Sequence, residues 1–187
     1  MTKVIFIIAA TLGVVVIAGV ILSLVAPKKI SVRSTQFIQA SRQQVFDQLR
    51  FMKNFPAWSP FRQQDPEQQF EISGPDGEVG ATFSWVGVKE QSRGSQQVVA
   101  LNGTESLKIQ CTITEPFQSN PTFSYTLNEK DGGVELVQLF ETEMPAPTNI
   151  IGLLMGLKDN IAATNQQGLA LLREVTEKQY AAPLTAY

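Results

Sequence analysis

The chain has 187 residues, 43% of them hydrophobic, and its 15 basic and 17 acidic side chains give a net charge of −2. It contains no histidine and one cysteine, which excludes histidine-based triads, histidine-containing zinc sites and thiolate metal clusters, so we expect no metal and no cofactor. Residues 30–187 hold 12 of the basic and all 17 acidic residues, and this net charge of −5 argues against a nucleic-acid partner and against adhesion to anionic lipid through charge alone.

The N-terminal segment is the most apolar part of the chain. Val4–Ala26 is a run of 23 residues without a charge, an amide or an aromatic hydroxyl. At ~1.5 Å per residue, a helix of this length crosses a ~30 Å hydrocarbon core. A cleaved secretory signal is the alternative, but its apolar region is roughly 7–15 residues long, and here Pro27 would follow the cut. We therefore expect residues 1–29 to form an uncleaved, single-pass membrane anchor.

The basic residues around this segment bear on its orientation. Lys3 precedes the apolar run, and Lys28, Lys29 and Arg33 follow it. By the positive-inside rule, this distribution favours a cytoplasmic C-terminal domain, although a signal-anchor with the opposite orientation stays open. The lone Cys111 offers no intrachain disulfide that would report the compartment.

The domain begins with a strand and two short helices. Ile30–Gln39 has the pattern of a strand, and Ser41 is a candidate N-cap for a short helix with one apolar face. The segment Phe51–Phe61 contains two prolines among aromatic residues, which predicts a second short helix that ends in an ordered, apolar loop.

Six strands follow, separated by turn residues. We expect them at Gln69–Ser73, Ala81–Val86, Ser95–Leu101, Ser106–Thr114, Thr122–Asn128 and Val134–Glu143. In most of them apolar and polar residues alternate, so that Phe83 and Trp85 share one face and Ser84 points to the other. The last strand has apolar residues on both faces, which predicts an edge strand covered from both sides. The pattern is an antiparallel meander with one apolar face.

A long helix is predicted after the strands. Thr148 or Asn149 caps it, and apolar residues then recur at spacings of three, four and seven to about Lys178. Such a helix would cover the apolar face of the sheet and close a domain of residues 30–178. Residues 179–187 have no periodicity, and we expect them to form a flexible tail.

The first two turns of this helix are apolar on every side. Residues 150–157 therefore cannot all face the sheet, and something else has to cover them. We expect this cover to be the aromatic loop Phe55–Phe61, with the bilayer surface and a bound ligand as alternatives.

Several segments together carry a family resemblance. They are Val32-Arg33-Ser34, Ala40-Ser41, Val45-Phe46-Asp47, Phe55–Phe61, Gly74, Val79-Gly80-Ala81, Trp85, Glu115-Pro116 and the single C-terminal helix. With these features the chain resembles the START/Bet v 1-like superfamily, also called SRPBCC or polyketide cyclase/dehydrase and lipid-transport domains, in a membrane-anchored bacterial form. The resemblance covers residues 30–178.

The resemblance implies an α+β fold of the helix-grip type, in which a curved antiparallel sheet wraps around the long C-terminal helix. It also implies a cavity between them for a hydrophobic small molecule or lipid, which we take as the expected partner. The residues expected to line it are Phe83, Trp85, Ile109, Cys111, Phe123 and Tyr125 on the sheet and Leu157, Ile161, Thr164 and Gly168 on the helix. Ordinary core packing is the alternative for each of them.

Two other functions stay open. A cyclase or dehydratase would need an acid or base in the cavity, and the candidates are Glu71, Glu90, Arg93, Glu141, Asp159 and Tyr125. Their spacing does not bring them together, so we expect binding rather than catalysis. A protein-interaction module at the membrane is the third possibility.

Overall fold

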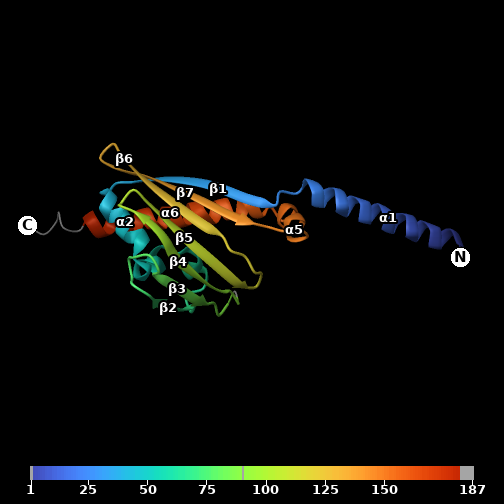
Figure 1. The fold of residues 1–187 in the computed structure, drawn as a ribbon, viewed down its shortest axis with the longest axis horizontal. Helices are drawn as coiled ribbons and strands as arrows, with labels where there is room; N and C mark the ends of the chain where they lie inside the picture. The colour runs from blue at the N-terminus through green and yellow to red at the C-terminus, as the bar shows by residue number, and fades with distance from the viewer. Residues whose placement is uncertain (1, 90, 182–187) are drawn as a thin grey trace, which may run out of the picture.

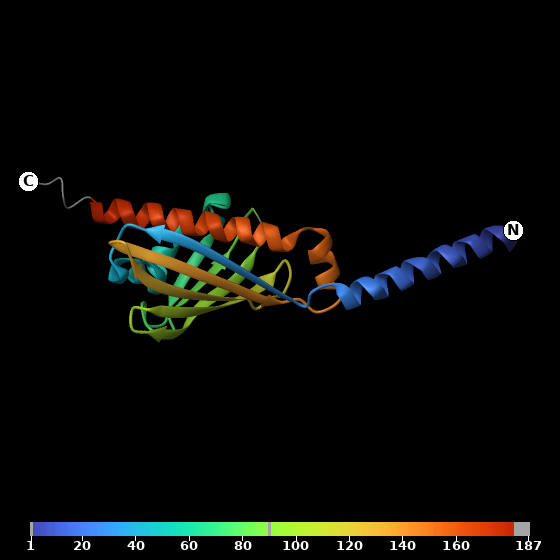
Figure 2. The ribbon, with the colours of Figure 1, turned by 90° about the horizontal axis from the view of Figure 1, so that it is seen from above.

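The fold consists of an extended N-terminal helix followed by a curved sheet that wraps around a long C-terminal helix. The structure is a computed structural model and describes residues 2–89 and 91–181. The helix α1 (Thr2–Val25) points away from the domain, and α6 (Leu157–Ala181) lies along the concave face of the sheet (Figures 1 and 2).

Seven antiparallel strands form one sheet in the order β1-β7-β6-β5-β4-β3-β2. The strands are β1 (Lys29–Ile38), β2 (Gln69–Ser73), β3 (Thr82–Val86), β4 (Arg93–Asn102), β5 (Ser106–Glu115), β6 (Thr122–Lys130) and β7 (Gly133–Glu143). The predicted strands are thus confirmed, each to within two residues at either end. The prediction that the last strand is an edge is wrong, because β7 pairs with both β1 and β6. The edges are β1 and β2.

The remaining helices are short except for α2. They are α2 (Arg42–Arg50), the 3₁₀ helix η1 (Met52–Asn54), α3 (Phe55–Trp58), α4 (Pro60–Gln64) and α5 (Thr148–Leu154). The predicted single C-terminal helix is in fact two, α5 and α6. The break lies at Gly156, whose φ of +61° is left-handed and ends the first helix. Helix α6 continues to Ala181, so the expected tail starts as helix, and residues 182–187 lie outside the described residues.

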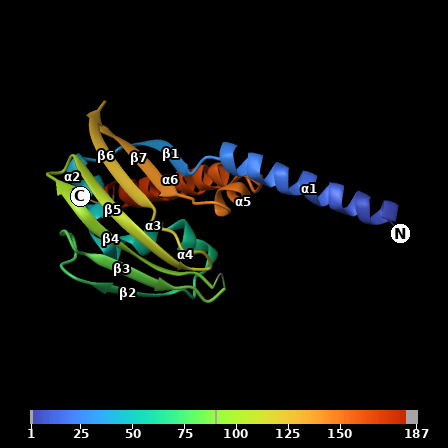
Figure 3. The same ribbon diagram turned by 45° about the vertical axis from the view of Figure 1, so that its right-hand side comes forward.

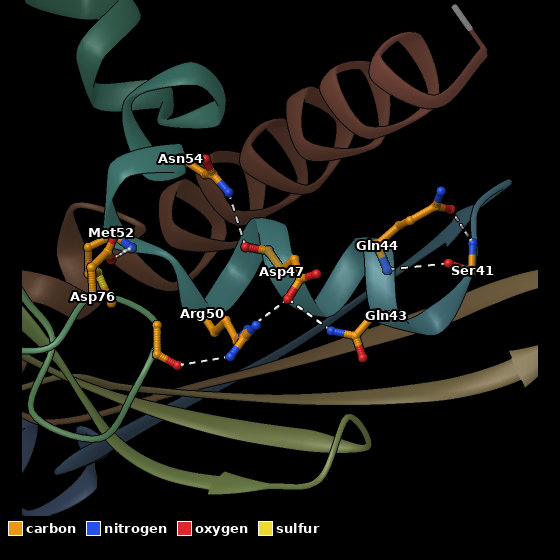
Figure 4. A network of polar contacts seen from close by, with 9 residues as sticks. Ser41, Gln43, Gln44, Asp47, Arg50, Met52, Asn54 and Asp76 are labelled. Atoms are coloured by element: carbon orange, nitrogen blue, oxygen red, sulfur yellow. Dashed lines mark hydrogen bonds and ion pairs between the residues drawn. The ribbon is translucent and has the colours of Figure 1, made fainter. Parts of the chain in front are cut away.

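The N-terminus of α2 confirms the predicted cap. The Ser41 hydroxyl accepts a hydrogen bond from the backbone N–H of Gln44 at 3.3 Å, and the Gln44 side chain accepts one from the Ser41 N–H at 2.8 Å (Figure 4). This reciprocal pair is a capping box, which satisfies two backbone donors that the first turn would otherwise leave free.

A polar network fixes the chain after α2. The carboxylate of Asp47 pairs with Arg50 at 2.7 Å, and its backbone carbonyl accepts a hydrogen bond from the Asn54 amide at 3.1 Å (Figure 4). Asp76, between β2 and β3, accepts a hydrogen bond from the backbone N–H of Met52 at 2.6 Å. These contacts fix the chain just before α3, and the two short helices α3 and α4 pack against α6 (Figure 3).

The core lies between α6 and the concave face of the sheet. Leu169 and Leu172 of α6 are fully buried there with Phe83 and Leu127. Closer to α1, a second cluster consists of Ile30, Val32 and Phe140, against which the first two turns of α6 pack. Burying each large apolar side chain contributes ~1.5–3 kcal/mol to folding.

Helix α5 packs at the base of α1. The Asn149 amide donates a hydrogen bond to the carbonyl of Ala26 at 3.2 Å, so this turn is tied to the end of the N-terminal helix. Four apolar side chains of this region remain exposed: Ile151 at 54%, Leu153 at 48%, Leu154 at 73% and Met155 at 70%. The expected cover by the loop Phe55–Phe61 is therefore wrong, because α3 and α4 occupy a different part of α6.

Candidate ligand-binding cavity

A cavity of about 150 Å³ lies between the sheet, the α3–α4 segment and the middle of α6. Its lining residues are Phe55, Trp58, Ser59, Pro60, Phe61, Gln68, Phe83, Trp85, Ser92, Gln96, Cys111, Pro121, Phe123, Tyr125, Gln138, Thr164, Asn165, Gly168 and Leu169. One of these residues, Phe61, is also 52% exposed on the protein surface.

Seven of the ten residues predicted for this site line the cavity. They are Phe83, Trp85, Cys111, Phe123, Tyr125, Thr164 and Gly168. The other three are placed elsewhere. Ile109 is buried in the main core, while Leu157 and Ile161 pack on the second cluster with Val32 and Phe140. The first turns of α6 face β1 and β7, and the helix faces the cavity only around residues 164–169.

The aromatic wall of the cavity is built by α3 and β3. The ring of Phe55 meets Trp58 edge-on at 4.8 Å and Phe83 at 5.1 Å between ring centroids. The Trp58 indole donates a hydrogen bond to the carbonyl of Gln48 in α2 at 3.3 Å, so the buried polar end of this ring is satisfied. The Trp58 ring thus lines the cavity without an unsatisfied N–H.

The Trp85 indole packs closely against a glycine on the neighbouring strand. Gly94 pairs with Trp85 across β3 and β4, and a β-carbon added at Gly94 would lie 2.6 Å from the indole atom Cζ2. The same β-carbon would lie 2.5 Å from the carbonyl oxygen of Thr112. The indole therefore occupies the space that any side chain at position 94 would need.

Polar side chains gather at one part of the wall. Gln138 and Tyr125 face each other across β7 and β6, and the Gln138 amide donates a hydrogen bond to the Tyr125 hydroxyl at 3.1 Å. Burial raises the pKa of Tyr125 above its usual value of 10.0, and the hydrogen bond from Gln138 opposes this shift. Burial likewise raises the pKa of the Cys111 thiol from 9.0 to about 12. Both groups are neutral near pH 7.

On the helix side, Gly168 lies against the short helix α4. A β-carbon at Gly168 would lie 3.5 Å from Cδ and 3.6 Å from Cγ of Pro60, which is ordinary van der Waals contact. The glycine thus leaves a small space next to the cavity rather than permitting a close backbone approach.

Sequence reasoning missed Gln138, Asn165 and the helices α3 and α4 as parts of the site. A signal for the first two exists in the pattern. Gln138 lies at even spacing with Leu136 and Phe140 on an otherwise apolar strand face, and Asn165 lies four residues after Ile161 on the apolar stripe of α6. A polar side chain on a buried face has to find a partner, which marks a candidate site.

Two of the acid–base candidates form ion pairs at the surface. Glu141 pairs with Lys29 at 2.8 Å, and this hydrogen bond and charge lower the pKa of the Glu141 carboxyl. Arg93 lies 3.6 Å from the carboxylate of Glu115. Neither lines the cavity.

The other candidates are also separated. Glu71 and Asp159 are exposed, and Glu90 lies outside the described residues. Tyr125 alone lines the cavity, and within the described part of the chain no lining residue is Asp, Glu, Lys or Arg. The same part of the chain contains no group of three Cys, Asp or Glu side chains that could hold a metal ion.

No protein-family model matches the sequence, and no curated protein matches it by sequence. Solved structures do match the fold. Protein CV1439 from Chromobacterium violaceum has a TM-score of 0.59 at 14% identity, and the match covers 79% of this chain and 96% of that one. Ara h 8.0201 has a TM-score of 0.57 at 13% identity, with 79% and 97% covered.

A third similar structure is the di-domain ARO/CYC StfQ from the steffimycin biosynthetic pathway. Its TM-score is 0.60 at 10% identity, and the match covers 82% of this chain and 52% of StfQ. At these identities the comparisons bear on architecture rather than activity. The seven-stranded antiparallel sheet around a long C-terminal helix is the expected α+β helix-grip fold, and these similar structures share it.

Proposed function

We propose that the domain binds a small hydrophobic molecule in the cavity between the sheet, α3–α4 and α6. The observation that carries this proposal is the character of the wall, which combines aromatic rings with a few polar groups and has no charged side chain among its described residues. Ligand sites for apolar molecules have this composition. A cavity of about 150 Å³ lined by apolar side chains is large enough to hold benzene.

We further propose that α1 anchors this domain in a membrane. The segment Lys3–Val25 is long and apolar enough to span a bilayer. At its base, α5 and the following turn expose Ile151, Leu154 and Met155, and an apolar surface of this kind is favourable against a lipid interface. The domain would then sit on the bilayer with α5 in contact with it. The basic residues after the span favour the cytoplasmic side.

Intrinsic fluorescence provides a direct test. The chain contains two tryptophans, Trp58 and Trp85, and both line the cavity. Full-length protein in lipid nanodiscs is titrated with toluene, and we expect a saturable change in tryptophan emission. The variant Gly168→Leu, in which the added side chain fills the helix side of the cavity, should remain folded and lose the response.

The control separates binding from an effect of toluene on the lipid. An equal change in tryptophan emission in the wild type and in folded Gly168→Leu would mean that toluene acts through the bilayer. The proposal would then fail. Absence of any saturable change in the wild-type protein would also refute it.

A second candidate function is catalysis of the cyclase or dehydratase type. Similarity in fold to an ARO/CYC protein favours it, as does a hydroxyl donor, Tyr125, on the cavity wall. The neutral phenol could donate a hydrogen bond to a substrate carbonyl but, with its raised pKa, could not act as a base near pH 7. Turnover of an aromatic polyketide analogue by the wild type, abolished in Tyr125→Phe, would support this candidate over simple binding.

A further inference from the structure

Two buried polar atoms on the cavity wall lack a hydrogen-bond partner within the described part of the chain. They are the carbonyl oxygen Oε1 of Gln138 and the amide nitrogen Nδ2 of Asn165. Their residues are only 4% and 8% exposed, and both line the cavity. Buried amide groups without partners are strongly unfavourable, so each such group calls for an explanation. A ligand that enters the cavity can supply both partners.

The Tyr125–Gln138 pair limits what this ligand can be. With the Gln138 amide donating to the Tyr125 oxygen, the glutamine carbonyl is a free acceptor and the phenol proton is a free donor. If the amide is rotated by half a turn, the phenol donates to the glutamine carbonyl. The glutamine N–H is then the free donor and the phenol oxygen the free acceptor. In both arrangements the pair offers at least one donor and one acceptor, and the two N–H groups of Asn165 Nδ2 add further donors.

We propose that the cavity binds a neutral molecule with a single hydroxyl group, a small alcohol or phenol. A hydroxyl has one proton to donate and two lone pairs to accept with, so it can donate to the free acceptor of the Tyr125–Gln138 pair and accept from one donor of that pair and one of Asn165. The apolar part of the molecule would lie against the aromatic wall of Phe55, Trp58 and Phe83. This inference rests on the proposed binding function and names the class of ligand.

The other ligand classes fit less well. A carboxylate or an ammonium group would be buried without a counter-charge, because no charged side chain lies among the described residues of the wall. An ether or a ketone accepts hydrogen bonds but cannot donate to the free acceptor. A hydrocarbon leaves every one of the three groups unsatisfied. The cavity volume of about 150 Å³ corresponds to a single ring.

The test compares phenol with toluene, which have similar size and differ in the hydroxyl. Dissociation constants are measured from tryptophan emission with the full chain in nanodiscs, for the wild type and for Asn165→Leu. Both compounds contain the same aromatic ring, so the ratio Kd(toluene)/Kd(phenol) removes any difference between the two proteins in affinity for the ring itself. We expect this ratio to fall about tenfold in Asn165→Leu, because one hydrogen bond to the hydroxyl is lost.

Asn160→Leu is the matched control. Asn160 also lies on α6, but it does not line the cavity, and its amide donates a hydrogen bond to the carbonyl of Met155 at 3.3 Å. The same change of asparagine to leucine at this position should leave the ratio unchanged. The wild type alone provides a reading that depends on no variant. Its ratio should exceed the preference expected from the partitioning of the two compounds between water and an alkane by at least about tenfold.

The outcomes separate the inference from the function on which it rests. If neither compound alters the emission, the proposed binding function fails and the inference fails with it. If both bind and the wild-type ratio equals the alkane value, or if Asn165→Leu leaves the ratio unchanged, the cavity is an apolar site whose polar groups are satisfied by water. In that case binding stands and the hydroxyl inference is overturned.

Discussion

Alanine in place of Gly168 is expected to stabilise the protein, whereas alanine in place of Gly94 is expected to destabilise it. Gly168 lies inside α6, where alanine is favoured over glycine by ~1 kcal/mol. The new β-carbon would meet Pro60 at 3.5 Å, an ordinary contact, so nothing opposes this gain. For a chain of this size a gain of ~1 kcal/mol corresponds to an increase in Tm of ~2–4 °C.

At Gly94 the same substitution meets a backbone atom of one neighbouring strand and the Trp85 ring of the other. The β-carbon would lie 2.5 Å from the backbone carbonyl oxygen of Thr112 and 2.6 Å from the Trp85 ring, both far inside normal contact distance. Overpacking of this kind costs ~1–3 kcal/mol. The Trp85 ring would also have to move, so the emission of the folded state should change in Gly94→Ala.

The assay is thermal and urea unfolding of the full chain in nanodiscs, followed by tryptophan emission, because both tryptophans belong to the domain and none lies in α1. Opposite signs of the two changes support the placement of the glycines. If Gly168→Ala lowers the free energy of unfolding, or if Gly94→Ala leaves it unchanged, the arrangement of α4, α6 and Trp85 described above is wrong.

Three further predictions concern the core, the cysteine and the anchor. Leu172→Asp should destabilise the domain by about 3 kcal/mol or more, because it buries an unpaired carboxylate. Arg173→Asp, on the exposed side of α6, should change the urea midpoint of unfolding little. Equal effects of the two substitutions would contradict the helix register. At pH 8 the Cys111 thiol should react with a thiol reagent only after unfolding. Its raised pKa of about 12 leaves about a thousandfold less thiolate than in a free cysteine. Rapid labelling of the folded protein would show that Cys111 is not buried. Deleting residues 1–29 should release a soluble, folded, β-rich domain by circular dichroism, and an insoluble product would contradict the division into anchor and domain.

The sequence by itself determined the elements and most of their faces. Turn residues and alternation with a period of two identified the strands. Alternation put Phe83 and Trp85 on one face, because neighbouring side chains of a strand point to opposite sides. Ser41 followed three residues later by Gln44 is a local signal, and it fixed the start of α2. The length and composition of the apolar N-terminal run likewise predict a helix long enough to span a membrane.

Only the tertiary structure decided where these faces meet. Ile109 points to the predicted face of the sheet, yet it is buried in the main core. Leu157 and Ile161 face β1 and β7, because α6 crosses the curved sheet so that only its residues 164–169 reach the cavity. Periodicity along one element carries no information on that crossing. The break at Gly156 was equally hidden, since an apolar pattern continues across it and a left-handed φ depends on the backbone alone. The cavity wall also brings together Tyr125, Gln138 and Asn165, which lie up to 40 positions apart in the sequence. Their proximity depends on the strand order and on the placement of α6 in the complete fold.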